Sequence, residues 1–222
     1  MSYNARVPAA SPSRLNVLFI GNSFTARNDL PGLIATIATA AGKSLEHRLI
    51  SAGGASLRRH WNAGEAAKAI ESGGYDYVVL QEQSTLPIKN RDRMHENVRL
   101  FHAAIRSAGA KTALYLTWAR QHAPQTQATI TEAYQLIAAE TGATIVPAGI
   151  AWELFLRKHD HPVLHDRDGS HPTLAGSYLA ACVAFEVLFR ADLPRGVEIR
   201  GLPTADEQRL RTVAARSIDA VR

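Results

Sequence analysis

The sequence predicts an α/β fold in which helices cover both faces of a parallel sheet. Short apolar runs alternate with longer segments of helical spacing along nearly the whole chain. This alternation is typical of parallel strands joined by helical crossovers. The chain has 222 residues, 46% of them hydrophobic, which is enough for one sizeable core. We therefore expect a single domain over residues 1–222, with a flexible N-terminal segment at 1–14.

The first half of this domain is expected to contain three strands. Residues 16–20 form an apolar run between Arg14 and Gly21, as in a central strand that is buried on both faces. Residues 44–50 alternate in polarity, as in an edge strand. The other elements expected here are a helix at 30–41 closed by Gly42, a helix at 57–72 and a buried strand at 75–80.

The second half continues the alternation and ends in helices. A helix is expected at 93–108, because Val98, Phe101 and Ile105 share one of its faces. The remaining expected elements are strands at 111–117 and 144–146, helices at 127–140, 150–157 and 174–189, and an amphipathic tail at 205–221.

Charge and composition argue against several classes of function. The net charge is +5, but Lys and Arg are scattered among acidic residues without an aromatic-basic repeat, so we expect no nucleic-acid partner. No run approaches the roughly 20 consecutive apolar residues of a membrane span. Residues 1–14 lack the apolar core of a signal peptide, so we expect a cytoplasmic protein without a membrane partner.

Cofactor sites leave characteristic patterns that this sequence lacks. Cys182 is the single cysteine, so neither an intramolecular disulfide nor a thiolate metal cluster can form. The phosphate-binding patterns Gly-x-x-x-x-Gly-Lys-Ser/Thr and Gly-x-Gly-x-x-Gly do not occur. We therefore expect no cofactor and no metal, and the oligomeric state stays open.

Functional residues of an open parallel sheet lie in the loops that follow its strands, because the crevice opens at the carboxyl ends. Asn22 in the first of these loops and Trp118 in the fourth are candidates for lining a pocket, although core packing explains Trp118 equally well. The loops concerned are 21–29, 51–56, 81–90, 118–126 and 166–172.

A serine, Ser23, comes just after the first predicted strand, in the segment Gly-Asn-Ser-Phe-Thr at 21–25. A serine in this place is a candidate nucleophile. The segment does not match the Gly-x-Ser-x-Gly nucleophile elbow. The alternative interpretation is that Asn22 and Ser23 cap the next helix, as Asn and Ser often do.

A carboxylate precedes a histidine by three residues in the late segment Asp168-Gly-Ser-His171-Pro172. An Asp that accepts from the histidine Nδ1–H fixes the tautomer, so that Nε2 can take the proton of a serine hydroxyl. The alternative is a turn in which Asp168 and Ser170 cap a helix and His171 is exposed. A triad of Ser23, His171 and Asp168 is therefore one of two interpretations of these two segments.

The two segments together resemble the first and last blocks of the SGNH (GDSL-like) hydrolase superfamily. Two short segments are most similar to a bacterial branch of SGNH-like proteins: Gly-Asn-Ser-Phe-Thr at 21–25 and Leu-Gln-Glu-Gln-Ser at 80–84. The resemblance implies a three-layer α/β/α sandwich of the flavodoxin-like kind with a five-stranded parallel sheet. It also implies an esterase, lipase or carbohydrate deacetylase with Ser23 as nucleophile and Asp168 and His171 as its partners.

The third block departs from the family pattern. The superfamily has Gly-x-Asn-Asp, whose Asn side chain donates to the oxyanion, where this chain has Gln81-Glu-Gln-Ser84. Gln81 or Gln83 would have to replace that donor, beside the backbone N–H groups of Ser23 and Gly54. Ungapped alignment favours Gln83, whereas proximity to the strand favours Gln81.

The function expected from these residues is that of a serine esterase or deacylase. Its partner would be a small-molecule or carbohydrate ester with a short acyl or acetyl group. One alternative is a non-catalytic glycan-binding module on the same fold, favoured by the altered third block. The other is a metal-dependent hydrolase that uses the late cluster, although a solvated loop explains that cluster better. The cluster consists of His159, Asp160, His161, His165, Asp166 and Asp168.

Overall fold

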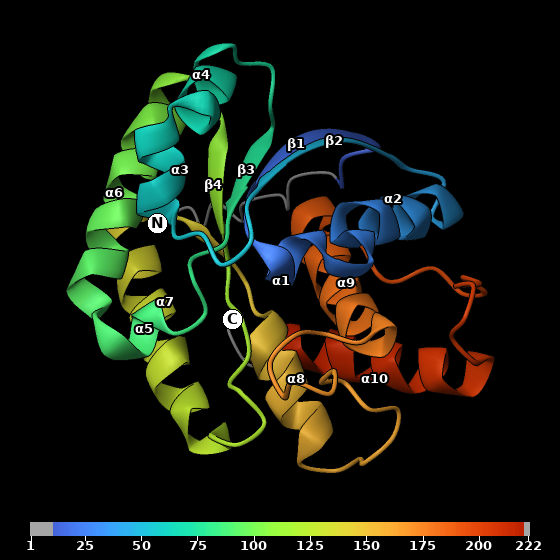
Figure 1. Ribbon diagram of the computed structural model, residues 1–222. Helices are drawn as coiled ribbons and strands as arrows, with labels where there is room; N and C mark the ends of the chain where they lie inside the picture. Colours follow the sequence, from blue (N-terminus) through green and yellow to red (C-terminus); the bar gives the residue numbers. More distant parts are fainter. Residues whose placement is uncertain (1–10, 220–222) are drawn as a thin grey trace, which may run out of the picture.

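A five-stranded parallel sheet forms the centre of the molecule (Figure 1). The computed structural model describes residues 11–219. The strand order is β2-β1-β3-β4-β5, and every neighbouring pair is parallel. The predicted parallel α/β fold is therefore confirmed, with β2 at one edge as expected. The strands are β1 (Arg14–Gly21), β2 (Ser44–Ser51), β3 (Tyr77–Leu80), β4 (Lys111–Tyr115) and β5 (Thr144–Val146).

Helices cover both faces of the sheet and give the predicted three layers (Figure 1). One face carries α2 (Leu30–Ala40), α8 (Ala148–Leu156) and α9 (Leu174–Phe189). The other carries α3 (Leu57–Ala63), α4 (Glu65–Glu71), α6 (Arg91–Ser107) and α7 (Gln127–Thr141). The helix α10 (Thr204–Asp219) packs outside α8 and α9, and the one-turn helices α1 (Ser23–Ala26) and α5 (Leu86–Lys89) follow β1 and β3.

The central position of β1 follows from its side chains. Val17 and Phe19 point into the core beneath α2 and α9, while Leu18 and Ile20 point into the core beneath α3 and α6. Successive side chains of a strand alternate between faces, so only an uninterrupted apolar run can fill both cores. The strand therefore lies inside the sheet, between β2 and β3, and the loop after it opens between both helical layers.

The expected helix at 57–72 is wrong in one respect, because the structure divides it into α3 and α4. Gly64 ends α3 with a left-handed backbone (φ +79°), a conformation that favours glycine. The turns α1 and α5 lie where loops were expected, since single turns lack the apolar periodicity that reveals a longer helix. The one-turn helices α1 and α5 follow the ends of β1 and β3, where the candidate site lies.

The predicted flexible segment 1–14 is only partly open to comparison, because residues 1–10 lie outside the described part of the chain. In the described part of this segment, Ser11 donates to the Phe189 carbonyl at 2.8 Å, and Arg14 begins β1. Within residues 11–219, no helix combines the length and apolarity needed to cross a membrane.

Candidate active site

Three side chains from two distant segments meet at the carboxyl edge of the sheet. Ser23 Oγ lies 2.8 Å from His171 Nε2, and His171 Nδ1 lies 2.5 Å from Asp168 Oδ2. Ser23 comes from the first loop, and the other two come from the segment that leads into α9. The structure thus brings together the three residues that the sequence suggested as a triad.

The end of β1 holds Ser23 in a tight turn. A Cβ atom at Gly21 would approach both Gln81 Oε1 and Thr25 Oγ1 to 2.7 Å, so only glycine fits there. Asn22 caps α1, because its side-chain oxygen accepts from the Phe24 N–H at 3.1 Å. The helix-cap alternative is therefore correct for Asn22, and it is compatible with a nucleophile, since the cap leaves the Ser23 hydroxyl directed at His171.

The late loop orients Asp168 through its own backbone. Asp168 Oδ1 accepts from the N–H groups of Ser170 and His171, both at 2.9 Å, which leaves Oδ2 for the imidazole. The hydrogen bond from the His171 ring, helped by these N–H groups, holds the pKa of the Asp168 carboxyl below its usual range. The neighbouring carboxylate has another partner, since Asp166 forms an ion pair with Arg27 at 2.7 Å.

This arrangement determines which histidine nitrogen is free. An ionised carboxylate can only accept, so Nδ1 carries the proton that it donates to Asp168. Nε2 is then the acceptor for the Ser23 hydroxyl proton. Chemically, the three groups can raise the nucleophilicity of the serine oxygen.

Three buried polar side chains tie the first three loops to one another. Gln81 joins the third loop to the first, because its Oε1 accepts from the Asn22 N–H at 2.8 Å. Asn22 joins the first loop to the second, since its Nδ2 donates to the Ala55 carbonyl at 3.0 Å. Glu82 joins the third loop to the end of the second by accepting from the N–H of Leu57, the first residue of α3, at 3.0 Å. Each pair of loops therefore has its own buried hydrogen bond.

The two glutamines suggested for the oxyanion have different surroundings. Gln81 is 1% exposed; its Oε1 also accepts from the Thr25 hydroxyl, and its Nε2 donates to the Glu82 carbonyl. Gln83 is half-buried, and its Oε1 accepts from the Thr85 N–H and hydroxyl, both at 2.9 Å. Within residues 11–219, the Gln83 Nε2 and the backbone N–H groups of Ser23 and Gly54 have no hydrogen-bond partner.

Solved structures of the same fold include hydrolases and esterases. A candidate SGNH hydrolase from Slackia heliotrinireducens is 28% identical, with a TM-score of 0.70 over 79% of this chain and 99% of that chain. A DUF4886 family protein from Bacteroides uniformis is 22% identical, with a TM-score of 0.75 over 92% and 95%. An acetyl-xylooligosaccharide esterase variant from Geobacillus is 18% identical, with a TM-score of 0.60 over 78% and 94%.

This chain has the SGNH hydrolase fold. The SGNH hydrolases and esterases among these neighbours support an SGNH-type ester hydrolase, as the sequence predicted. The sequence itself matches no family model and no curated protein.

Asn22 and Trp118 are the two residues that the sequence suggested for lining a pocket. Asn22 lines none of the cavities described below, because both ends of its amide are used within the loops. Trp118 is only 2% exposed, but its edges line two cavities. It stacks on Phe24, which contacts His171, and on Trp152 at 3.8 Å between ring centroids. Trp118 therefore serves both core and pocket.

Cavities flank Trp118 on two sides of the loop that follows β4. The smaller, of about 220 Å³, lies between the loops after β3 and β4 and is lined by Ser84, Ile88 and Ala123 among others. The larger, of about 540 Å³, lies towards α8 and is lined by Trp152, Leu156 and Val163 among others. Ile88, Leu156 and Val163 belong to the few large apolar side chains that are exposed. Apolar surface thus gathers beside the aromatic stack that adjoins the triad.

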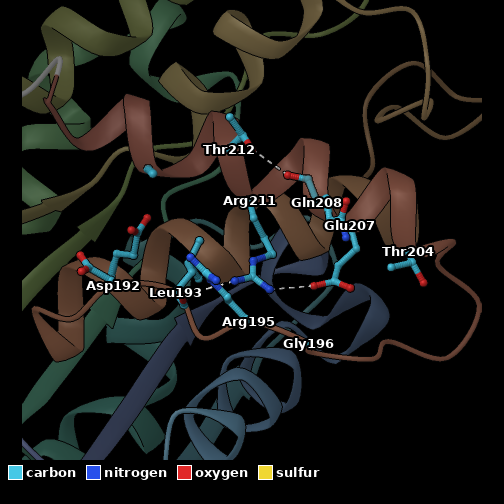
Figure 2. Close-up of a pocket in the computed structure, with 11 residues that line it drawn as sticks. Asp192, Leu193, Arg195, Gly196, Thr204, Glu207, Gln208, Arg211 and Thr212 are labelled. Atoms are coloured by element: carbon cyan, nitrogen blue, oxygen red, sulfur yellow. Dashed lines mark hydrogen bonds and ion pairs between the residues drawn. The ribbon is translucent and has the colours of Figure 1, made fainter.

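A third cavity, of about 520 Å³, lies away from the candidate active site. Figure 2 shows it between α10 and the segment 192–196. Arg211 reaches across from α10 and donates to the Glu207 carboxylate at 3.1 Å and to the Leu193 carbonyl at 3.2 Å. None of its lining residues comes from the loops that carry Ser23, His171 and Asp168, so it is not part of the candidate site.

Sequence analysis did not identify two buried histidines as residues that support the loops near the site. His60 Nε2 lies 2.7 Å from the Gly21 carbonyl, and His165 Nε2 lies 3.0 Å from the Ala119 carbonyl. Burial lowers the pKa of each imidazole. His165 was considered as part of a metal cluster, but within residues 11–219 no group of three or more ligating side chains is arranged to hold a metal ion.

Proposed function

We propose that this protein is a serine esterase that cleaves carboxylic esters through Ser23, His171 and Asp168. The observation that carries the proposal is the continuous chain of contacts from Ser23 Oγ to His171 Nε2 and from His171 Nδ1 to Asp168 Oδ2. These are the distances at which a hydroxyl, a general base and its orienting carboxylate act together. An exposed histidine that merely follows a turn would not meet a serine 148 positions earlier in the chain.

The mechanism follows from the donors and acceptors. Ser23 Oγ attacks the ester carbonyl carbon while His171 Nε2 takes its proton, and the carbonyl oxygen becomes the oxyanion of a tetrahedral intermediate. The C–O bond to the alcohol then breaks, and His171 gives its proton to the leaving alkoxide. Water attacks the resulting acyl-enzyme by the same route, which releases the carboxylic acid and restores Ser23.

The oxyanion would be bound by donors that the fold leaves free. Ser23 and Gly54 supply backbone N–H groups, and Gln83 supplies the side-chain amide that the superfamily takes from asparagine. A pre-positioned donor acts mainly on the transition state, because the negative charge develops there. Gln81 is assigned to holding the turn at Asn22, since its oxygen accepts from that backbone.

The substrate class proposed is an ester with a short acyl group. The cavity of about 220 Å³ beside Ser84 and Trp118 is smaller than the roughly 300 Å³ at which sites for drug-sized ligands begin. It lies next to the loop that carries Gln83, where the acyl carbonyl would be held. An acetyl-xylooligosaccharide esterase among the structural neighbours agrees with a small acyl group.

The proposal is tested with the purified protein and nitrophenyl esters of increasing acyl length. We expect hydrolysis of acetyl and butyryl esters, unchanged after exhaustive chelation, and a fall in kcat/KM with longer chains. A fluorophosphonate probe should add one mass increment at Ser23. Glycan binding without turnover or labelling would support the binding-module alternative, and loss of activity on chelation would support the metal-dependent one.

The two glutamines provide a separate prediction. Gln83→Ala should lower kcat about 100- to 1,000-fold with KM nearly unchanged, the usual consequence of losing one oxyanion donor. Gln81→Ala should instead lower the melting temperature, because it leaves the buried Asn22 N–H without its acceptor. Steady-state kinetics and thermal melts of both variants separate the two roles. Equal kcat in Gln83→Ala and wild type would remove Gln83 from the oxyanion site.

A further inference from the structure

Glu82 is a buried carboxylate at the point where the second and third loops meet. Its side chain is 1% exposed, and it lies between the two glutamines of the third loop. Glu82 Oε1 accepts from the N–H groups of Leu57 at 3.0 Å and Gln83 at 2.7 Å. Glu82 Oε2 accepts from Asn97 Nδ2 at 2.8 Å. Three donors from three segments therefore converge on one carboxylate.

A chain of hydrogen bonds connects this carboxylate to the guanidinium of Arg58. Asn97 on α6 is also buried, and its Oδ1 accepts from Arg58 Nε at 3.0 Å. Burial raises the pKa of the Glu82 carboxyl, while Asn97, the two N–H groups and the charge of Arg58 act in the opposite direction. An isolated buried charge is strongly unfavourable, and the donors around Glu82 offset part of that cost.

Two of the donors to Glu82 belong to, or closely follow, the segments that carry the groups proposed to bind the oxyanion. The Gln83 N–H belongs to the residue whose amide is proposed as a donor, and the Leu57 N–H follows the loop that contains Gly54. The other two pairs of loops are already tied by Gln81 and by Asn22. Among the described side chains, Glu82 is therefore the one that connects the third loop to the start of α3, directly after the second loop.

We propose that Glu82 is a positioning residue, which holds the second and third loops at the separation that the oxyanion site requires. The proposal rests on the proposed esterase function. In this proposal Glu82 itself does not contact the substrate. Its carboxylate sets where the Gly54 N–H and the Gln83 amide lie relative to Ser23, and a displacement of about 1 Å of such donors lowers turnover on the order of 100-fold.

The test exchanges donors and acceptors around the carboxylate. Glu82→Gln keeps one oxygen for Leu57 and Gln83 but places an NH₂ group against Asn97 Nδ2, so that two donors face each other. We expect kcat per fluorophosphonate-reactive Ser23 to fall about 100-fold with KM nearly unchanged. Adding Asn97→Asp should restore kcat to within about tenfold of wild type, because the new carboxylate at position 97 accepts both from the new amide at position 82 and from Arg58 Nε.

A matched control lies on the same helix as Asn97. His95 is also buried and bonds the Ala133 carbonyl at 2.7 Å, away from both loops. His95→Gln should change the melting temperature but not kcat per reactive serine. Asn97→Ala removes the donor to Glu82 Oε2 and the acceptor of Arg58 Nε but keeps the Glu82 carboxylate. It should show a smaller kcat loss than Glu82→Gln and serves if that variant does not fold.

The outcomes distinguish this inference from the proposed function. Wild-type kcat in folded Glu82→Gln or, failing that, in folded Asn97→Ala would overturn the positioning role and leave the esterase intact. A kcat loss that Asn97→Asp does not reverse, with melting changes like those of His95→Gln, would also overturn it. Wild-type protein without turnover or probe labelling would overturn the esterase function and this inference with it.

Discussion

Replacing Ser23 with alanine is expected to lower kcat for a short acyl ester by roughly four to six orders of magnitude. Members of a catalytic triad act as a unit, so removing the nucleophile removes nearly the whole contribution of His171 and Asp168 as well. The fold should persist, because the Ser23 hydroxyl has one hydrogen bond, to His171, and supports no other element. The measurement is steady-state turnover together with a thermal melt.

The control for this variant is another serine-to-alanine change outside the site. Ser217 is buried in α10, where its hydroxyl donates to the Ala214 carbonyl at 2.7 Å. Ser217→Ala should keep wild-type kcat and probe labelling even if its melting temperature falls. Undiminished turnover in Ser23→Ala, or a probe adduct mapped to another residue, would contradict the assignment of the nucleophile.

The second large effect is expected at the histidine and its carboxylate. His171→Ala should approach the loss seen in Ser23→Ala, because no other base in the described part of the chain lies within hydrogen-bond reach of the serine. Asp168→Asn should lower kcat by about 10⁴-fold, since an asparagine NH₂ cannot accept from Nδ1–H and favours the wrong tautomer. Melting temperatures should change much less than rates.

Asp166 provides the matched control for this carboxylate. It is two residues away and forms its ion pair with Arg27, in which both side chains are exposed by more than two fifths. Such an exposed pair contributes little, so Asp166→Asn should leave kcat within about tenfold of wild type. If Asp166→Asn were the variant with the severe kcat loss, the assignment of Asp168 would be wrong.

Much of the fold could be predicted because its signals are local. The apolar run at 16–20 and the alternation at 44–50 distinguish a central strand from an edge strand, and both positions agree with the sheet. The spacing of Asp168 and His171 is equally local, since a three-residue separation within one loop lets a carboxylate reach the imidazole. Local spacing does not indicate that Ser23 contacts Asp168 and His171. The resemblance to the SGNH superfamily predicted that contact.

The third loop could not be predicted, because its side chains are defined by partners far away in the sequence. Gln81 and Gln83 have the same chemistry and differ in their partners, which for Gln81 include the buried Asn22 N–H, 59 positions away. Glu82 gave no signal either, because a glutamate in a polar loop is normally exposed. The break at Gly64 was missed since apolar spacing continues across it.

The packing of α10 outside α9 also constrains how the molecule acquires its structure. Nearly every residue of α9 is buried, so no face of this helix tolerates water, and α10 covers one side through Leu210, Val213 and Ala214. Because α10 follows α9 in the chain, an emerging polypeptide leaves that side of α9 uncovered until residues 204–219 have been synthesised. During that interval the exposed apolar side is a target for chaperones and for aggregation.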